Sequence, residues 1–260
     1  AAGRAHPPRR SHSLLCDLSW PPHTGSALDP SPRFLLCSSF LSSTSAGGAI
    51  EGALFEPAGA GKTGALVVVH EWHGLNEVMK RHCEQFAQAG FVTLAPDLFH
   101  GRVAANDDEA AKLMAAFDFQ QAVGEIGAAV AFLRAHPRCN GRVAVAGFCL
   151  GGALTLAAAR HVPGLDAAVP FYGLPRFPVD EFAHVTTPIC GHYARVDPWA
   201  NPAVAEEIQR TVRAGGGQME LYVYDAEHAF MRETDASRYE PKSAALAWRR
   251  TVEFLHRHVG

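Results

Sequence analysis

One segment of this chain, residues 143–152 (VAVAGFCLGG), constrains its fold more than any other. A run of small apolar residues, typical of a buried strand, ends in the pattern G-x-C-x-G around Cys149, and the helix-forming stretch ALTLAAAR follows. Glycines flank the cysteine because a strand that reverses sharply into a helix leaves no room for side chains beside the turn. The pattern predicts a strand–turn–helix unit with Cys149 at a helix N-terminus, where backbone N–H groups and the helix dipole favour the thiolate. A buried cysteine in a tight turn would give the same pattern, so the rest of the chain has to decide.

From residue 47 onward, apolar runs of strand type alternate with segments of helical periodicity. A hydrophobic content of 48% is enough for the core of one domain. Strands separated by helices of this length predict an α/β fold, in which helices cover both faces of a mostly parallel sheet. Besides the unit around Cys149, the expected strands are 50–55, 64–70, 91–99, 166–173, 187–194 and 219–224, and the expected helices are 76–89, 106–117, 119–135, 201–214 and 241–258.

Residues 1–46 differ from the remainder in composition. They contain ten serines, six prolines and four arginines but only two acidic residues, without sustained periodicity. Such a segment buries too little apolar surface to offset the entropy of ordering it. It could be a transit peptide, a disordered extension or upstream sequence that is not native to the domain. We favour an extension outside the fold, followed by a single domain over residues 47–260.

Charge and cysteine content exclude several classes of function. A net charge of -3 gives no support for binding to nucleic acid or to an anionic membrane surface. No apolar run approaches the roughly 18 residues that span a bilayer. The six cysteines are scattered without C-x-x-C pairs, which indicates free thiols in a reducing, cytoplasmic compartment. We expect a monomer that acts on a small molecule.

Polar residues follow the ends of several different expected strands. Glu71, Cys149, Asp197 and His228 each occupy such a position, and so does Asp97, because Pro96 breaks the strand expected at 91–99. In open α/β sheets, ligands bind at the carboxyl ends of the strands. The sequence therefore predicts that these side chains converge on one site.

The order Cys149, Asp197, His228 is the nucleophile, acid and histidine order of the α/β-hydrolase fold. In such a triad the imidazole takes the thiol proton and later protonates the leaving group, while the carboxylate orients the ring. Two other acids compete with Asp197. Asp225 lies too close in sequence to His228 to come from another strand end, and Asp180 follows no strand.

Five segments in order resemble the dienelactone hydrolase family, the carboxymethylenebutenolidases of the α/β-hydrolase fold. They are VVVHEWHGLN, APDLFHGR, GFCLGGALT, RVDPWANP and AEHAFMRE. The resemblance covers residues 50–260 and implies an enzyme that cleaves the ester bond of a small lactone through an acyl intermediate on the cysteine of the triad.

The resemblance also implies roles for individual residues. The backbone N–H groups of Leu150 and Trp72 would form the oxyanion hole. Glu71 would hold the cysteine side chain in the resting enzyme and help to form the thiolate once substrate arrives. Arg102 and Arg232 would grip the carboxylate of an anionic lactone, since the guanidinium fork matches a carboxylate. The alternative for both arginines is an ordinary surface salt bridge.

The chain departs from the family pattern at a few positions. Phe99 stands where the family often has tyrosine, so a hydroxyl contact with substrate is expected to be missing. Trp72 and His73 form a bulkier pair than is usual. The histidines of HEWH, His70 and His73, are three apart on a loop rather than four apart on a helix, so we predict no metal. The loop AGAGKTG leads into a strand instead of a helix, which argues against a phosphate-binding loop, and no cofactor is expected.

Two other functions remain open from sequence. One is a broader cysteine-dependent carboxylesterase or thioesterase that acts on small acyl substrates. The other is a non-catalytic binding protein with the same fold, although the presence of nucleophile, acid, base and both arginines argues against it.

Overall fold

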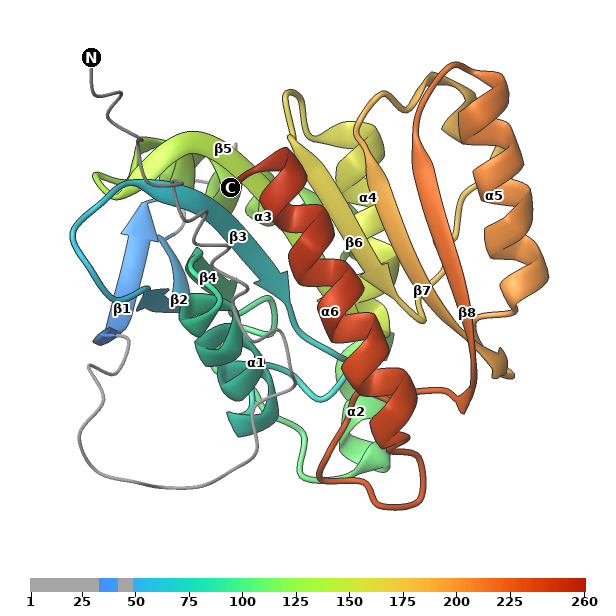
Figure 1. The fold of residues 1–260 in the computed structure, drawn as a ribbon. Coiled ribbons are helices and arrows are strands. Elements are labelled where there is room, and N and C mark those ends of the chain that lie inside the picture. Colours follow the sequence, from blue (N-terminus) through green and yellow to red (C-terminus); the bar gives the residue numbers. More distant parts are fainter. Residues whose placement is uncertain (1–32, 42–48) are drawn as a thin grey trace, which may run out of the picture.

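A computed structural model describes residues 33–41 and 49–260 of the chain (Figure 1). The strands are β1 (Arg33–Leu41), β2 (Ala49–Glu56), β3 (Thr63–Val69), β4 (Val92–Pro96), β5 (Cys139–Phe148), β6 (Ala167–Phe171), β7 (Ile189–Val196) and β8 (Met219–Glu227). They form one eight-stranded sheet in the order β1-β2-β4-β3-β5-β6-β7-β8. β2 pairs antiparallel with both of its neighbours, and every pair from β4 to β8 is parallel.

Helices cover both faces of the sheet (Figure 1). They are α1 (Glu77–Gln88), α2 (Asp107–Ala115), α3 (Phe119–Ala135), α4 (Leu150–His161), α5 (Pro202–Ala214) and α6 (Pro241–His258), together with a short 3-10 helix, η1 (Val179–His184). α1 and α6 pack over one face, where the rings of Phe86 and Trp248 lie 4.7 Å apart. α3 and α4 bury the apolar residues of the other face, among them Ile126 and Leu154. The α/β fold predicted from the sequence is confirmed.

Side-chain caps start several of these helices where the sequence predicted them to start. The side-chain oxygen of Asn76 accepts hydrogen bonds from two N–H groups of the first turn of α1, and Asp118 does the same for α3. Asn201 caps α5. Capping satisfies backbone donors that have no partner within the helix. Local sequence thus defines the helix starts, and the expected strands and helices are present with ends that differ by only a few residues.

The N-terminal boundary differs from the one expected. β1 lies within the segment that we placed outside the fold, and its backbone pairs with β2 over residues 33–41 and 49–56. The pairing is irregular between Cys37 and Phe40. An edge strand obtains its hydrogen bonds from its neighbour in the sheet, so no periodicity of its own is needed to form it. The remainder of the expected extension lies outside the described residues.

Six parallel strands, from β4 to β8 in the sheet, place their carboxyl ends at one edge. β3, β5, β6, β7 and β8 are consecutive in the sheet, with β5 and its following helix α4 near the centre. The residues directly after these strands include all three members of the expected triad. Among the helices of residues 49–260, none has the length and apolar character that a membrane-crossing segment needs.

Candidate active site

The turn between β5 and α4 holds Cys149 in a strained backbone conformation. Its φ of 54° and ψ of -112° are unusual for a residue with a side chain, and such strain costs roughly 1–3 kcal/mol. Glycine is required on both sides of Cys149 because other backbone atoms approach these two positions closely. A β-carbon at Gly147 would lie 2.2 Å from the carbonyl oxygen of Gly151, and one at Gly151 would lie 2.2 Å from that of Val69. The tight strand–turn–helix unit lifts the cysteine side chain above the edge of the sheet.

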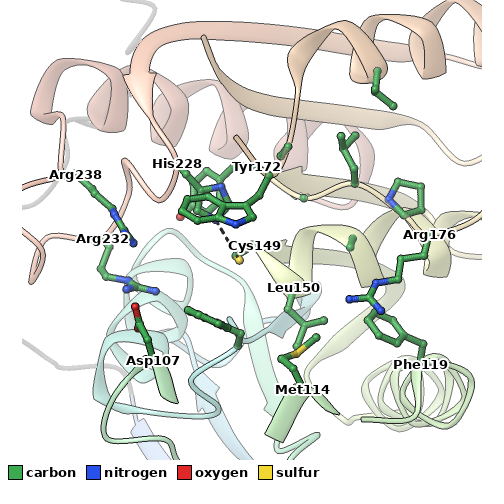
Figure 2. A pocket seen from close by; sticks show the side chains of 18 residues that line it. Asp107, Met114, Phe119, Cys149, Leu150, Tyr172, Arg176, His228, Arg232 and Arg238 are labelled. Atoms are coloured by element: carbon green, nitrogen blue, oxygen red, sulfur yellow. Dashed lines mark hydrogen bonds between the residues drawn. The ribbon is translucent and has the colours of Figure 1, made fainter. Parts of the chain in front are cut away.

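Cys149, His228 and Asp197 form a connected set (Figure 2). The sulfur of Cys149 lies 3.2 Å from Nε2 of His228, and Nδ1 of that ring lies 2.8 Å from Oδ2 of Asp197. The other oxygen of Asp197 accepts hydrogen bonds from the N–H groups of Trp199 and Ala200, at 2.9 and 2.8 Å. Burial raises the pKa of Asp197, but the hydrogen bonds from His228 and the backbone outweigh it and lower the pKa overall. The carboxylate is therefore charged and orients Nε2 toward the sulfur.

The two competing acids lie elsewhere. Asp225 forms an exposed ion pair with Arg195, and Asp180 lies in η1. Among the three candidate acids, Asp197 is the one that contacts His228.

At rest, the side chain of Cys149 is a thiol. Burial and the negative charge of Glu71 raise the pKa of Cys149 to about 12, against the smaller opposite effects of the Leu150 N–H group and of Arg232. The helix N-terminus favours the thiolate, as the sequence suggested, but desolvation is the larger effect. The proton therefore rests on the sulfur, with Nε2 of His228 beside it at 3.2 Å.

This pKa predicts slow alkylation of the free enzyme. Iodoacetamide should modify Cys149 roughly a hundredfold more slowly at pH 7 than an ordinary thiol, because little thiolate is present and its greater nucleophilicity offsets only about half of that deficit. The rate should rise steadily between pH 7 and 9 as the thiolate fraction grows, and Glu71→Gln should accelerate it by removing the charge that raises the pKa. Mass spectrometry of the Cys149 peptide measures both effects, with Cys149→Ala as the control. A fast rate that is constant over this pH range would show instead that a thiolate exists at rest.

Glu71 and Arg232 form a buried ion pair beside the nucleophile. Oε2 of Glu71, a residue only 3% exposed, accepts hydrogen bonds from Nε of Arg232 at 3.0 Å and from Nη2. The resemblance implied that Glu71 holds the cysteine side chain at rest. Here its carboxylate is engaged by Arg232, and the sulfur faces His228. A buried carboxylate needs a paired cation, which the thiol could not supply.

These residues surround a cavity of about 600 Å³. Cys149, His228 and Arg232 lie on its wall, as do Leu150 and Trp72, whose backbone N–H groups were expected to form the oxyanion hole. Figure 2 shows Cys149 at the centre, with Arg232 on one side and Arg176 on the other. The cavity can hold a small molecule with a carbonyl group against the sulfur and an anionic group near Arg232.

A model of the dienelactone hydrolase family matches residues 50–259. This chain belongs to the dienelactone hydrolase family. Among its relatives, Protein usf of Aquifex pyrophilus is 35% identical over 75% of this chain and 88% of that protein. A protein of Aquifex aeolicus named "Putative carboxymethylenebutenolidase" is 33% identical over 81% of this chain and 94% of its own length. A crystal structure of a "Putative Dienelactone Hydrolase" from Klebsiella pneumoniae has 25% identity and a TM-score of 0.75, covering 85% of this chain and 98% of that one. The predicted family and its hydrolase class are confirmed.

One residue expected from the dienelactone hydrolase pattern is absent from the cavity. Arg102 lines a separate pocket beside the start of α3, with Leu98 and Phe117 among its neighbours. Its Nε donates a hydrogen bond to the carbonyl oxygen of Phe99. The loop that carries Arg102 turns through the positive φ angles of His100 and Gly101 (53° and 85°), and this turn is not determined by residue spacing. The expectation that Arg102 shares a carboxylate with Arg232 is therefore wrong for this structure.

Several residues that the sequence did not point to also line the cavity. Tyr172 follows the end of β6, with a φ of 34°, and its ring packs at 5.1 Å against that of His228. Among the described residues, its buried hydroxyl finds no hydrogen-bond partner. Arg176 and Arg238 also line the cavity, and Trp199, 67% exposed, lies against His228 at 5.0 Å. From the sequence Tyr172 lies inside the strand expected at 166–173, so no signal there identified it as a site residue.

The histidines of HEWH have separate roles. Nε2 of His70 accepts the backbone N–H of Leu98 at 3.2 Å, whereas Nε2 of His73 lies 3.1 Å from Asp107. In the described part of the chain, no three His, Cys, Asp or Glu side chains are grouped so that they could hold a metal ion. Asp97, also placed at a strand end, accepts hydrogen bonds from the N–H groups of Phe99 and Gly101 and so stabilises its own loop.

Proposed function

We propose that this hydrolase cleaves the ester bond of a small lactone that bears a carboxylate, through an acyl intermediate on Cys149. The observation that supports the proposal most strongly is the alignment of Cys149, His228 and Asp197, at 3.2 and 2.8 Å, in a cavity whose wall includes Arg232. The name of the Aquifex aeolicus relative, carboxymethylenebutenolidase, is consistent with a lactone of this kind.

The reaction begins with proton transfer from the Cys149 thiol to Nε2 of His228 as the sulfur attacks the lactone carbonyl. The negative oxygen that forms accepts hydrogen bonds from the backbone N–H groups of Leu150 and Trp72. The ring C–O bond then breaks, and His228 returns the proton to the departing oxygen. The product is a thioester that still carries the opened chain.

Hydrolysis of the thioester repeats these roles with water as the nucleophile. His228 removes a proton from the water, the hydroxide adds to the thioester carbonyl, and the C–S bond breaks. The proton on His228 passes to the sulfur, which regenerates the thiol and releases the acid. Asp197 stays ionised throughout and stabilises the imidazolium.

Arg232 and Glu71 connect substrate binding with thiolate formation. A carboxylate that binds Arg232 competes with Glu71 for the same guanidinium. The freed Glu71 carboxylate, whose charge disfavours a thiolate beside it, would act as a hydrogen-bond acceptor that draws on the thiol proton before His228 takes it. The hydroxyl of Tyr172 supplies a further donor to the substrate. It remains protonated, because burial and the charge of Glu71 raise the pKa of this phenol well above its usual value.

The test compares two substrates of similar size, a lactone that bears a carboxylate and a neutral ester. We expect kcat/KM to be at least about tenfold higher for the anionic lactone, in line with one charge-assisted hydrogen bond. Prior treatment with iodoacetamide at pH 9, long enough to modify Cys149 completely, should abolish both activities. Equal values for the two substrates would remove the anionic lactone from the proposal.

The position of Arg102 outside the cavity supports the second candidate function, a broader esterase or thioesterase. Of the two arginines that the resemblance implied, only Arg232 lines the cavity, and selectivity for anions would be lower unless Arg176 or Arg238 takes the place of Arg102. A neutral thioester that is hydrolysed faster than the anionic lactone would favour this second function.

A further inference from the structure

A groove of about 480 Å³ borders the cavity around Cys149. Phe119, Ala153, Pro175 and Arg176 line both spaces. In Figure 2, Arg176 and Phe119 lie side by side on the wall of the cavity, on the side away from Arg232. A molecule that reacts at Cys149 can therefore extend past the Arg176–Phe119 pair without leaving the protein surface.

The walls of this groove are mainly small or apolar. α4 contributes Ala153 and Ala157, which are four residues apart and therefore share one face of the helix. Both alanines are partly exposed, so their β-carbons border open space rather than the core. Val123 of α3 and the ring of Phe177 complete the walls. Phe177 stacks on Phe182 at 5.2 Å, which holds its ring in place.

The Lys or Arg side chain of the groove is Arg176, which lies where the groove borders the cavity. The guanidinium carbon of Arg176 lies 4.7 Å from the centre of the Phe119 ring. No carboxylate of the described residues forms an ion pair with Arg176, and the other polar side chains of the groove are Gln120 and His161. An anion placed deeper in the groove would find no second Lys or Arg. An apolar chain would remove the alanine, valine and phenylalanine surfaces from water.

A small lactone has no need of this additional space. The cavity beside Cys149, at about 600 Å³, is already large enough for a small ligand. The groove extends along α4 from Ala153 to His161, about 12 Å at 1.5 Å per residue. Its length and composition fit an extended hydrocarbon or aryl chain.

We propose that this groove is a subsite for an apolar chain attached to the reacting ester, on either its acyl or its alcohol side. The proposal rests on the proposed function for its kinetic test. Substrates with such a chain bind across Cys149, with the ester at the sulfur, any anionic group toward Arg232 and the chain along α4.

Two ester series test the subsite and separate the two sides of the ester. One series runs from 4-nitrophenyl acetate to the butyrate and hexanoate, and the other from methyl to butyl and hexyl acetate. In one of them kcat/KM should rise at least about tenfold from the shortest to the longest ester, because a fully buried methylene contributes up to about fourfold and the groove is partly open. Ala157→Leu, which fills the groove, should lower the ratio of longest to shortest ester about tenfold.

The matched control is Ala131→Leu, on the exposed side of α3. It should keep the wild-type ratio. If the enzyme hydrolyses the shortest esters but kcat/KM does not change with chain length in either series, the subsite is overturned and the proposed function stands. An equal loss in the two leucine variants would also overturn the subsite. Faster hydrolysis of a hexanoate-length ester with a terminal carboxylate, reversed by Arg176→Gln, would assign the groove to an anion instead.

Calorimetry with 1-hexanol and ethanol provides a test that needs no turnover. Hexanol should bind the wild-type protein more tightly than ethanol, and Ala157→Leu should weaken hexanol binding about tenfold. If no ester is hydrolysed, the proposed function fails and this measurement alone decides on the subsite. Equal hexanol binding by wild type and Ala157→Leu would overturn it.

Discussion

Cys149→Ala should abolish hydrolysis, with kcat reduced roughly 10⁶-fold, as expected when the nucleophile of a triad is lost. The variant lacks the sulfur that forms the acyl intermediate in the proposed reaction. Cys149→Ser should keep weak activity, because His228 must then help to form an alkoxide, which is harder to generate than a thiolate. Initial rates with a neutral 4-nitrophenyl ester and with an anionic lactone measure both effects.

The melting temperature provides the control for these variants. Cys149 is only partly buried and its sulfur faces the cavity, so both replacements should leave the fold intact. Wild-type turnover by a folded Cys149→Ala variant would refute the assigned nucleophile.

Arg232 should determine the preference for an anionic substrate. Replacing it with glutamine removes a charge-assisted contact of about 1.5–3 kcal/mol, so the ratio of kcat/KM for the anionic lactone to that for a neutral ester should fall roughly ten- to a hundredfold. The ratio is the appropriate measure, because Arg232 also lowers the pKa of Cys149 and its loss affects both substrates. Arg232→Lys should restore the preference only in part, since a point charge cannot reproduce the guanidinium fork.

Two further variants make this result interpretable. Arg232→Gln leaves the buried carboxylate of Glu71 without its cation, which destabilises the protein, so the double variant Glu71→Gln/Arg232→Gln should show the same loss of preference in a more stable background. Arg102→Gln is the matched control, since Arg102 lies outside the cavity and should leave the ratio unchanged. If Arg102→Gln lowers the ratio as much as Arg232→Gln, the loop of Arg102 moves when substrate binds.

Most of the sheet and the position of the site could be predicted from residue patterns. Apolar runs, caps and helical spacing are local signals for strands and helices. Because strand–helix–strand connections are right-handed, these elements form a parallel sheet whose carboxyl ends share one edge. For this reason the positions of Cys149, Asp197 and His228 at strand ends were sufficient to predict that they meet. Each of the three residues directly follows the end of its strand, so the spacing of the strand ends brings the three side chains within hydrogen-bond distance.

Features that depend on loop conformation or non-local pairing could not be predicted in this way. The direction of Arg102 depends on two positive φ angles in its loop, and the partner of Glu71 depends on how a buried charge is compensated by a residue 161 positions away. β1 has no distinctive pattern and forms through backbone pairing with β2. The groove beside α4 was also invisible in the sequence, because alanines on a helix indicate neither a core nor a cavity until the neighbouring loop is placed.

The most direct test of the account is to trap the acyl intermediate. Wild-type enzyme mixed with 4-nitrophenyl acetate and quenched in acid within the first turnover should gain the mass of one acetyl group, located by peptide mapping on Cys149. His228→Ala should show slower acylation, and Cys149→Ala should show no adduct at all. An acetyl group on another residue, or a burst of 4-nitrophenol without any adduct on Cys149, would contradict the account.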